Sequence, residues 1–350
     1  MSKRLIVTGG AGYIGSHVCV TLLEAGNEVL VIDNLDNSSA QAIERIEQIT
    51  GKTAPLLRAD LSDPSCKGQI LDAVKAFKPT GAIHLAGLKA VGDSVAQPMR
   101  YYRNNIEATW TLLEALEQAD AKRLVFSSSA TVYGDLNQNP VQEDGATGPT
   151  NPYGRTKLFI EEMLKDLAHS DSDWRICNLR YFNPVGAHAS GKIGEDPTGV
   201  PNNLFPFIAQ VAVGRRPKVN VYGNDYPTPD GTGVRDYIHV DDLAKGHMAA
   251  IHYLDENVPN DGANNTVDIN LGCGKGVSVL QAIEAFRNAA NREIAFEIAS
   301  RRPGDVAEIV ANAGKAAALL NWKTEKTLED MCQDHWRWQQ QNPNGYDTDS

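Results

Sequence analysis

The chain has 350 residues, of which 42% are hydrophobic and 22% charged, and its formal net charge is −11. This composition is typical of a folded protein of about two domains, and it excludes collagen-like, low-complexity and disulfide-scaffold classes. Because no block of five like charges occurs, the sequence predicts no broad basic face for nucleic acid or an anionic membrane.

The cysteines and the lengths of the apolar runs indicate the cellular compartment of the protein. The five cysteines are odd in number and none forms a CxxC pair, which is typical of reduced thiols in a cytoplasm. No apolar run reaches the 18 residues of a membrane span, and the first apolar segment ends at Gly9, which is too short for a signal peptide. We therefore expect a cytoplasmic protein without membrane association.

Short β-rich runs alternate with longer helical patterns in the first half of the chain. The predicted strands are residues 5–7, 28–33, 55–57, 81–85, 123–126 and 175–179, and a first helix over 13–25 ends at Gly26. This alternation is typical of parallel strands joined by right-handed crossover helices. The sequence predicts an α/β fold with a six-stranded, doubly wound parallel sheet of the Rossmann type.

The composition changes after about residue 180. Residues 183–237 are rich in Gly, Pro and Asn and predict long ordered loops around one helix over 204–213; helical pattern returns at 239–254 and 278–291. We expect one domain over residues 1–180 and a smaller mixed α/β domain over 181–350, with some chain crossing between the two. The last residues, 339–350, are expected to fray.

A glycine-rich loop follows the first strand. Gly9, Gly12 and Gly15 have the spacing of a dinucleotide-binding turn, where the backbone must approach a pyrophosphate at a helix N-terminus. Asp33 ends the second strand, at the place of a carboxylate that binds ribose hydroxyls. Residues 34–38 carry no Arg or Lys for a 2′-phosphate, so the loop predicts NAD rather than NADP. Asp60 follows the third strand and either meets the adenine amino group or caps a loop; both interpretations stay open.

Three side chains are candidates for the reacting groups. Tyr153 and Lys157 stand one helical turn apart, and Ser129 lies at the end of a predicted strand, where ligand chemistry occurs in doubly wound sheets. A lysine ammonium and a positive nicotinamide ring would both favour the phenolate and bring its pKa from about 10 toward neutrality. We expect Tyr153 to act as the general base and Ser129 to bind the reacting hydroxyl.

Other catalytic patterns are missing from the sequence. The eight histidines show no zinc spacing and no GxSxG motif occurs, so no metal site is expected. His239 and His247 are expected to be structural.

Together these motifs resemble the extended short-chain dehydrogenase/reductase superfamily and, within it, the UDP-glucose 4-epimerase family. The resemblance covers nearly the whole chain and rests on six segments in order: residues 8–17, 86–92, 127–134, 181–187, 223–228 and 231–240. It implies that the chain interconverts UDP-glucose and UDP-galactose, in galactose metabolism. Tightly bound NAD would take hydride from the sugar C4, the 4-keto sugar would rotate, and the hydride would return to its opposite face.

The resemblance also assigns residues. Besides the glycines, NAD would be lined by Tyr13, Ile14, Asp33, Asn34, Asn37, Asp60, Leu61, Lys89, Asn104 and Phe182. The nucleotide sugar would be held by Asn183, Asn203, Leu204, Asn220, Tyr222, Arg235, Arg302 and Asp305, and Ile309 would border the pocket around the sugar C2 substituent. The family is usually homodimeric, and segments 98–117 and 153–167 would supply the paired helices.

Two alternatives stay open at this point. Nucleotide-sugar 4,6-dehydratases share the glycine loop and the YxxxK spacing, but they typically carry Asp-Glu where this chain has Ala130 and Thr131. A non-catalytic NAD-sensing protein on the same fold has no need of Tyr153 or Lys157, which this chain keeps. The activity on N-acetylated UDP-sugars is not determined by the sequence.

Overall fold

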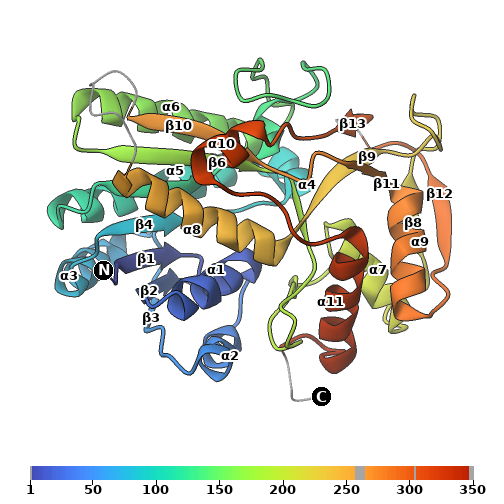
Figure 1. The fold of residues 1–350 in the computed structure, drawn as a ribbon, viewed down its shortest axis with the longest axis horizontal. Helices are drawn as coiled ribbons and strands as arrows, with labels where there is room; N and C mark the ends of the chain where they lie inside the picture. The colour runs from blue at the N-terminus through green and yellow to red at the C-terminus, as the bar shows by residue number, and fades with distance from the viewer. Residues whose placement is uncertain (1, 257–264, 303–304, 347–350) are drawn as a thin grey trace.

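The largest feature of the computed structural model, which describes residues 2–256, 265–302 and 305–346, is a sheet of seven parallel strands (Figure 1). The strand order is β10-β6-β5-β4-β1-β2-β3. The bounds are β1 (Arg4–Thr8), β2 (Glu28–Asp33), β3 (Leu56–Arg58), β4 (Gly81–His84), β5 (Arg123–Ser127), β6 (Arg175–Tyr181) and β10 (Thr266–Leu271). Strands β2 and β3 are added on one side of β1, and β4, β5, β6 and β10 on the other, so the strand order switches between β1 and β4. In doubly wound sheets, ligands bind beyond the carboxyl ends of the strands at such a switch point.

Helices cover both faces of this sheet. One face packs against α1 (Tyr13–Glu24), α2 (Ala40–Thr50), α8 (Val240–Glu256) and α10 (Gly314–Leu320), and the other against α3 (Lys67–Phe77), α5 (Pro98–Gln118) and α6 (Pro152–Ser170). Successive strand residues point to opposite faces, so Leu5 and Val7 of β1 enter the first core and Ile6 enters the second. Short helices α4 (Val91–Ala96), η1 (Pro64–Cys66) and η2 (Ala130–Val132) lie in the connections. The predicted doubly wound α/β fold is confirmed.

The sheet has one strand more than the sequence predicts. β10 pairs in parallel with β6, from Thr266 opposite Ile176 to Leu271 opposite Tyr181. Its residues alternate between polar and apolar, the pattern of a half-buried edge strand, whereas the central strands are nearly continuous apolar runs. The prediction of six strands was therefore wrong. The domain boundary near residue 180 stays a prediction.

The remaining elements form a smaller mixed α/β unit, whose helices α7, α9 and α11 lie on the right of Figure 1. Its elements are β7 (Asn183–Val185), β8 (Val219–Tyr222), β9 (Val234–His239), β11 (Gly276–Ser278), β12 (Phe296–Ala299), β13 (Glu308–Ile309), α7 (Leu204–Ala212), α9 (Val279–Ala290) and α11 (Leu328–Gln341). β9 pairs with β7, β11 and β13, and β8 pairs with β12. The three helices share a core around Phe205 and Phe286.

Local signals account for the ends of α9. The Ser278 hydroxyl accepts from the Gln281 N–H while the Gln281 side chain accepts from the Ser278 N–H, which forms a capping box. Asn291 ends the helix in the left-handed region, at φ 49°. The predicted helices over 13–25, 204–213, 239–254 and 278–291 are all present, as α1, α7, α8 and α9.

The C-terminal residues are packed as far as the structure describes them. α11 continues to Gln341, and the Tyr346 ring lies 4.9 Å from the ring of Trp338 and 4.8 Å from the guanidinium of Arg45. The Tyr346 N–H donates to Asp196 at 2.8 Å. The expected fraying of residues 339–346 was therefore wrong, and residues 347–350 lie outside the described residues.

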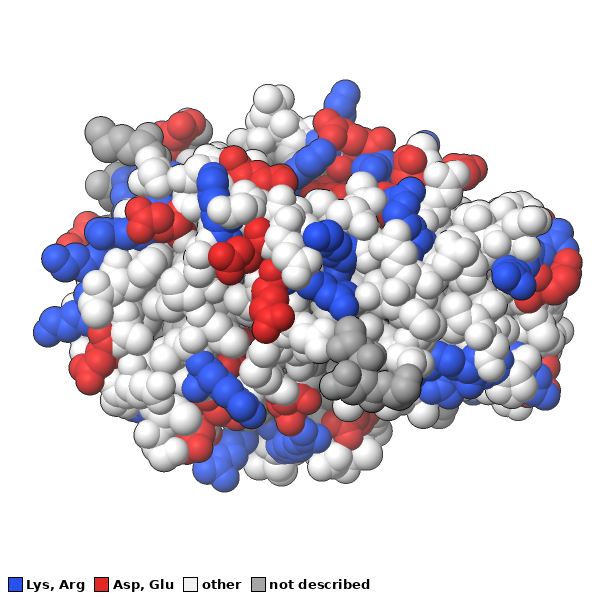
Figure 2. All heavy atoms as spheres, turned by 90° about the horizontal axis from the view of Figure 1, so that it is seen from below, with Lys and Arg blue, Asp and Glu red and all other residues white. Residues whose placement is uncertain are grey.

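The surface is mixed in charge. Figure 2 shows Lys and Arg interspersed with Asp and Glu over the face drawn there. Within the described ranges, no helix combines the length and the apolar character that crossing a membrane requires.

Candidate active site

The glycine loop lies between β1 and α1. Gly9 has a φ of +68°, and a Cβ on Gly15 would stand 2.1 Å from the carbonyl oxygen of Gly9, so neither position accepts a side chain without a backbone shift. No side chain caps α1 at Gly12, which leaves the first-turn N–H groups of Tyr13 and Ile14 available to a ligand. The loop is therefore a cradle that fits a pyrophosphate at a helix N-terminus.

Asp33, the last residue of β2, holds this loop in place. Its Oδ2 accepts from the N–H of Ala11 at 3.0 Å, and its Oδ1 accepts from the N–H of Leu35 and the hydroxyl of Ser38, at 2.9 and 2.8 Å. The structure thus gives Asp33 an anchoring role that the sequence did not suggest. Its contact with a ribose stays a prediction.

Asp60, Asn34 and Asn104 are linked beyond the ends of β2 and β3. Asn34 donates to Asp60 at 3.0 Å, Asp60 accepts from the hydroxyl of Ser62 at 2.7 Å, and Asn104 donates to that hydroxyl at 3.0 Å. Burial acts to raise the pKa of Asp60, but the hydrogen bonds from Ser62 and Asn34 outweigh it and lower the pKa. The structure therefore brings together three of the predicted cofactor residues.

The other predicted cofactor residues lie near the same edge of the sheet. Leu61 is buried, and Asn37 is exposed and accepts from the N–H of Thr198 at 3.3 Å. Phe182, just beyond β6, is buried in a small apolar cluster with Ala130 and neighbouring residues.

The three candidate reacting residues meet beyond the end of β5. Tyr153 and Lys157 lie on the buried face of α6, and Ser129 is the N-cap of η2, two residues after the end of β5. The Lys157 ammonium donates to the carbonyl oxygen of Ser127 at 2.7 Å and lies 5.8 Å from the centre of the Tyr153 ring. The Ser129 hydroxyl is hydrogen-bonded to Tyr153. The predicted convergence of these residues is present in the structure.

The pKa values of Tyr153 and Lys157 are shifted in opposite directions. Burial raises the pKa of Tyr153 to about 12, against the hydrogen bond from Ser129, which lowers it. Burial lowers the pKa of Lys157 to about 8, and the charge of Glu161 partly opposes this. The protein's own groups therefore keep Tyr153 protonated at neutral pH, so Lys157 alone does not produce the predicted shift toward neutrality.

A buried polar network behind these residues was not predicted. The hydroxyl of Ser127 lies 2.9 Å from Nε2 of His247, whose Nδ1 lies 2.9 Å from the carbonyl oxygen of Leu243. Tyr181 is hydrogen-bonded to the same hydroxyl. Burial lowers the pKa of His247 to about 4, so this ring is neutral at physiological pH, and its structural role stays a prediction.

Lys89 and Asn203 meet at a residue that sequence reasoning missed. Both contact the buried carboxylate of Glu195: Asn203 Nδ2 at 2.7 Å and Lys89 Nζ at 3.4 Å. Glu195 carries no motif, and only its burial distinguishes it from an ordinary loop glutamate. Tyr13, from the glycine loop, donates its hydroxyl to the carbonyl oxygen of Gly186 at 2.8 Å.

Most of the predicted sugar-nucleotide residues gather on β8, β9 and the segment before β13. Arg302 lies 4.8 Å from the centre of the Tyr222 ring and pairs with Asp305 at 2.9 Å, and Arg235 lies 4.0 Å from the same carboxylate. The other members of the predicted set in this unit are Asn220 on β8, Asn183 on β7, and Leu204 at the start of α7. Two guanidinium groups at one place can hold a diphosphate.

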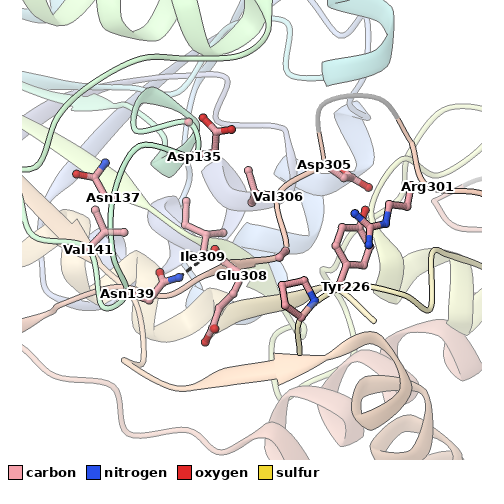
Figure 3. A pocket seen from close by; sticks show the side chains of 13 residues that line it. Asp135, Asn137, Asn139, Val141, Tyr226, Arg301, Asp305, Val306, Glu308 and Ile309 are labelled. Carbon is pink, nitrogen blue, oxygen red and sulfur yellow. Dashed lines mark hydrogen bonds between the residues drawn. The ribbon is translucent and has the colours of Figure 1, made fainter. Parts of the chain in front are cut away.

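A pocket of about 390 Å³ lies beside this group of residues (Figure 3). Ile309 and Asp305 line it, with Tyr226 and Arg301, which sequence reasoning did not assign to a site; the guanidinium of Arg301 lies 3.9 Å from the centre of the Tyr226 ring. Ile309 also packs against the cluster that contains Phe182. Among the described residues, no three His, Cys, Asp or Glu side chains gather as metal ligands do.

Comparison with known proteins identifies the family. A family model described as GDP-mannose 4,6 dehydratase matches residues 6–335. The UDP-glucose 4-epimerase of Bacillus subtilis is 53% identical over 98% of each chain, and that of Dictyostelium discoideum is 51% identical over 99% of this chain and 98% of its own. The chain belongs to the UDP-glucose 4-epimerase family.

Solved structures of UDP-glucose 4-epimerases have the same fold. The enzyme of Bifidobacterium longum, crystallised with NAD+ and UDP, is 49% identical, with a TM-score of 0.92 over 98% of this chain and 99% of its own. The enzyme of Stenotrophomonas maltophila, with bound NAD and formylated UDP-arabinopyranose, is 46% identical, with a TM-score of 0.92 over 97% and 99%. The family prediction is confirmed.

The dehydratase alternative is not favoured. The matched family model carries a dehydratase description, but the full-length relatives at about half identity are UDP-glucose 4-epimerases. In addition, η2 presents Ala130 and Thr131 beside Ser129, and neither side chain is the carboxylate that elimination of water needs.

Proposed function

We propose that the chain interconverts UDP-glucose and UDP-galactose with tightly bound NAD. The observation that carries the proposal is the meeting of Ser129, Tyr153 and Lys157 beyond β5, at the same edge of the sheet as the glycine cradle after β1. Membership of the UDP-glucose 4-epimerase family supports it. A protein that only senses NAD has no use for such a set of reacting groups.

The three residues divide the proton chemistry between them. Tyr153 takes the proton of the sugar 4-hydroxyl and returns it after the 4-keto sugar has rotated to present its opposite face. Ser129 shares the hydrogen bond to the reacting oxygen, and the Lys157 ammonium, 5.8 Å from the centre of the Tyr153 ring, would stabilise the phenolate with its charge. NAD, when bound, supplies the acceptor and then the donor of the hydride, so the cycle has no net redox change.

Residues on both sides of the switch point hold the ligands in this proposal. The cradle formed by Gly9, Gly12 and Gly15 takes the pyrophosphate of NAD, and the adenosine lies toward Asp33 and Asp60. The other residues proposed to line NAD are Tyr13, Ile14, Asn34, Asn37, Leu61, Lys89, Asn104 and Phe182. The UDP-sugar is held by Asn183, Asn203, Leu204, Asn220, Tyr222, Arg235, Arg302 and Asp305, with Ile309 beside its C2 substituent.

The assembly is proposed to be a homodimer in the cytoplasm. Large apolar side chains are exposed on two neighbouring helices: Met99 and Trp110 on α5 and Phe159 on α6, at 75%, 57% and 62%. Trp110 follows Met99 by eleven residues, three helical turns, so the two share one face of α5. Such a stripe fits the pairing of two helices from each subunit.

The decisive experiment is a substrate panel. Purified protein is incubated with UDP-galactose, and UDP-glucose is measured by ion-exchange chromatography. Formation of UDP-glucose at catalytic rates is expected. A 4-keto-6-deoxy product would support the dehydratase, and no turnover with retained NAD would support the sensing protein.

A further inference from the structure

Glu195 is a buried carboxylate that joins two exposed side chains from different parts of the fold. It lies between β7 and α7 and is 5% exposed. Its Oε1 accepts from Asn203 Nδ2 at 2.7 Å, and Lys89 Nζ lies 3.4 Å from the same oxygen. Lys89 follows β4 of the large sheet and Asn203 immediately precedes α7, so this carboxylate connects the side proposed to hold NAD with the side proposed to hold the UDP-sugar.

The burial of this carboxylate is unfavourable for folding. Oε2 of Glu195 is buried and accepts no hydrogen bond within the part of the chain that the structure describes. A buried acceptor without a donor destabilises a fold, and an apolar side chain of similar size would avoid the loss. The Trp338 indole N–H donates to the backbone carbonyl of Glu195 at 3.3 Å, which positions the main chain but does not use the carboxylate. Packing therefore does not explain a glutamate at this position.

The carboxylate determines the orientation of the Asn203 amide. An amide has a donor end and an acceptor end, and a carboxylate accepts only. With Nδ2 directed at Glu195, Oδ1 of Asn203 faces away from it, and the reversed orientation would press two oxygens together. The exposed end of Asn203 is therefore fixed as an acceptor.

We propose that Glu195 is a positioning residue, which fixes the Asn203 carbonyl to accept a hydrogen bond from a donor group of the UDP-sugar and anchors Lys89 beside it. The inference rests on the proposed function, because it needs the UDP-sugar as the ligand. Glu195 acts through Asn203 and takes no part in proton transfer.

The first test exchanges the carboxylate and the amide. In Glu195→Gln the new amide pairs with Asn203 in either orientation, so we expect KM for UDP-galactose to rise about tenfold while kcat stays within about twofold. In Asn203→Asp two carboxylates face each other, and KM rises again. The double variant Glu195→Gln/Asn203→Asp restores one donor, one outward acceptor and the original charge, so its KM returns to within about threefold of the wild type.

The outcomes separate the positioning role from a structural one. Recovery in the double variant supports the proposal; a double variant no better than either single variant, or a fall of kcat at unchanged KM, overturns it. Glu325→Gln, which breaks the exposed ion pair with Lys245, is the matched control and keeps wild-type kinetics. A wild type without epimerase activity would overturn the proposed function itself.

A second measurement covers the case in which Glu195→Gln does not fold. Asn203 is exposed, so Asn203→Asp is expected to fold and to retain NAD. Its two neighbouring carboxylates share a proton at low pH, and the KM of this variant should rise between about pH 5 and 8. A KM as independent of pH as that of Asn203→Ala would overturn the positioning role.

Discussion

The ammonium of Lys157 lies 5.8 Å from the centre of the Tyr153 ring, one turn further along α6. The carbonyl oxygen of Ser127 holds this ammonium at 2.7 Å, so its charge is fixed beside a buried phenol. Burial raises the pKa of Tyr153 to about 12 and lowers that of Lys157 to about 8. Burial therefore disfavours the phenolate, whereas the hydrogen bond from Ser129 and nearby positive charge favour it.

Removal of the Tyr153 hydroxyl should abolish proton transfer without disturbing packing. In Tyr153→Phe we expect kcat to fall by about 10² or more, with KM for UDP-galactose changed less than threefold, because the proposed base is lost and the ring remains. Steady-state kinetics on the NAD-containing variant check this. Tyr253→Phe, on α8, is the control, and near wild-type turnover of Tyr153→Phe would remove Tyr153 from the mechanism.

Removal of the Lys157 charge should act on the pH profile. The rate depends on the phenolate, whose fraction rises with pH, and loss of a neighbouring cation raises the pKa of Tyr153 further above its ordinary value. In Lys157→Ala the rising limb of kcat against pH therefore moves to higher pH, and the rate at neutral pH falls. If Lys157→Ala lowers kcat but leaves the rising limb of the pH profile at the wild-type pH, the electrostatic role is contradicted.

The fold was predictable where the evidence is local. The glycine spacing, the apolar runs of β1 to β6 and the capping signals around Ser278 and Asn291 each determine conformation over a few residues. β10 was missed because alternation of polar and apolar residues does not reveal its neighbour β6, 90 residues away. The packing of Tyr346 on Trp338 is likewise a tertiary contact without a local signal.

In the candidate site, too, residues with a local sequence signal were predictable and residues that depend on tertiary packing were not. Ser129, Tyr153 and Lys157 were predictable because their spacing has a chemical meaning on a helix and at a strand end. Glu195 was not, since its importance comes from burial between Lys89 and Asn203. The burial that raises the pKa of Tyr153 was not predictable either, because sequence spacing shows a nearby cation but not the packing around the phenol; the shift toward neutrality with NAD bound stays a prediction.

The purified protein should carry its own NAD. Hydride leaves and returns within one bound cofactor, so epimerisation should proceed without added NAD, and acid-released nucleotide should approach one equivalent per chain.

A Cβ on Gly15 would stand 2.1 Å from the Gly9 carbonyl, so Gly15→Ala should lose bound NAD and activity together. Gly92→Ala, with no heavy atom within 4 Å of the added Cβ, is the matched control. Accumulation of NADH with external NAD would indicate a dehydrogenase.

The exposed stripe on α5 should govern the oligomeric state. Trp110 is 57% exposed, so Trp110→Lys removes apolar surface from the proposed interface and places a charge there without disturbing the core. Sedimentation velocity should show a dimer for the wild type and a larger monomer fraction for the variant. Arg287→Ala, at an exposed ion pair with Glu284 within α9, should leave the dimer intact. A monomeric wild type would contradict the proposed assembly.

Ile309 should set the room around the sugar C2 substituent. It lines the pocket of Figure 3 and touches the cluster around Phe182 from β13, which is paired with β9 at Arg235. Isoleucine is shorter than tyrosine but β-branched and stiff, so it leaves intermediate room.

Apolar shape alone discriminates by about 1 to 3 kcal/mol per small group, which predicts partial exclusion of larger substrates. We expect good turnover of UDP-galactose and weak, measurable turnover of UDP-N-acetylgalactosamine. Ile309→Tyr should suppress the second selectively, because the larger ring fills the space an N-acetyl group needs, and Ile309→Leu should leave the ratio of kcat/KM values nearly unchanged. An equal loss on both substrates in Ile309→Tyr would mean that Ile309 only packs against the core, since a steric effect at C2 must fall on the larger sugar first.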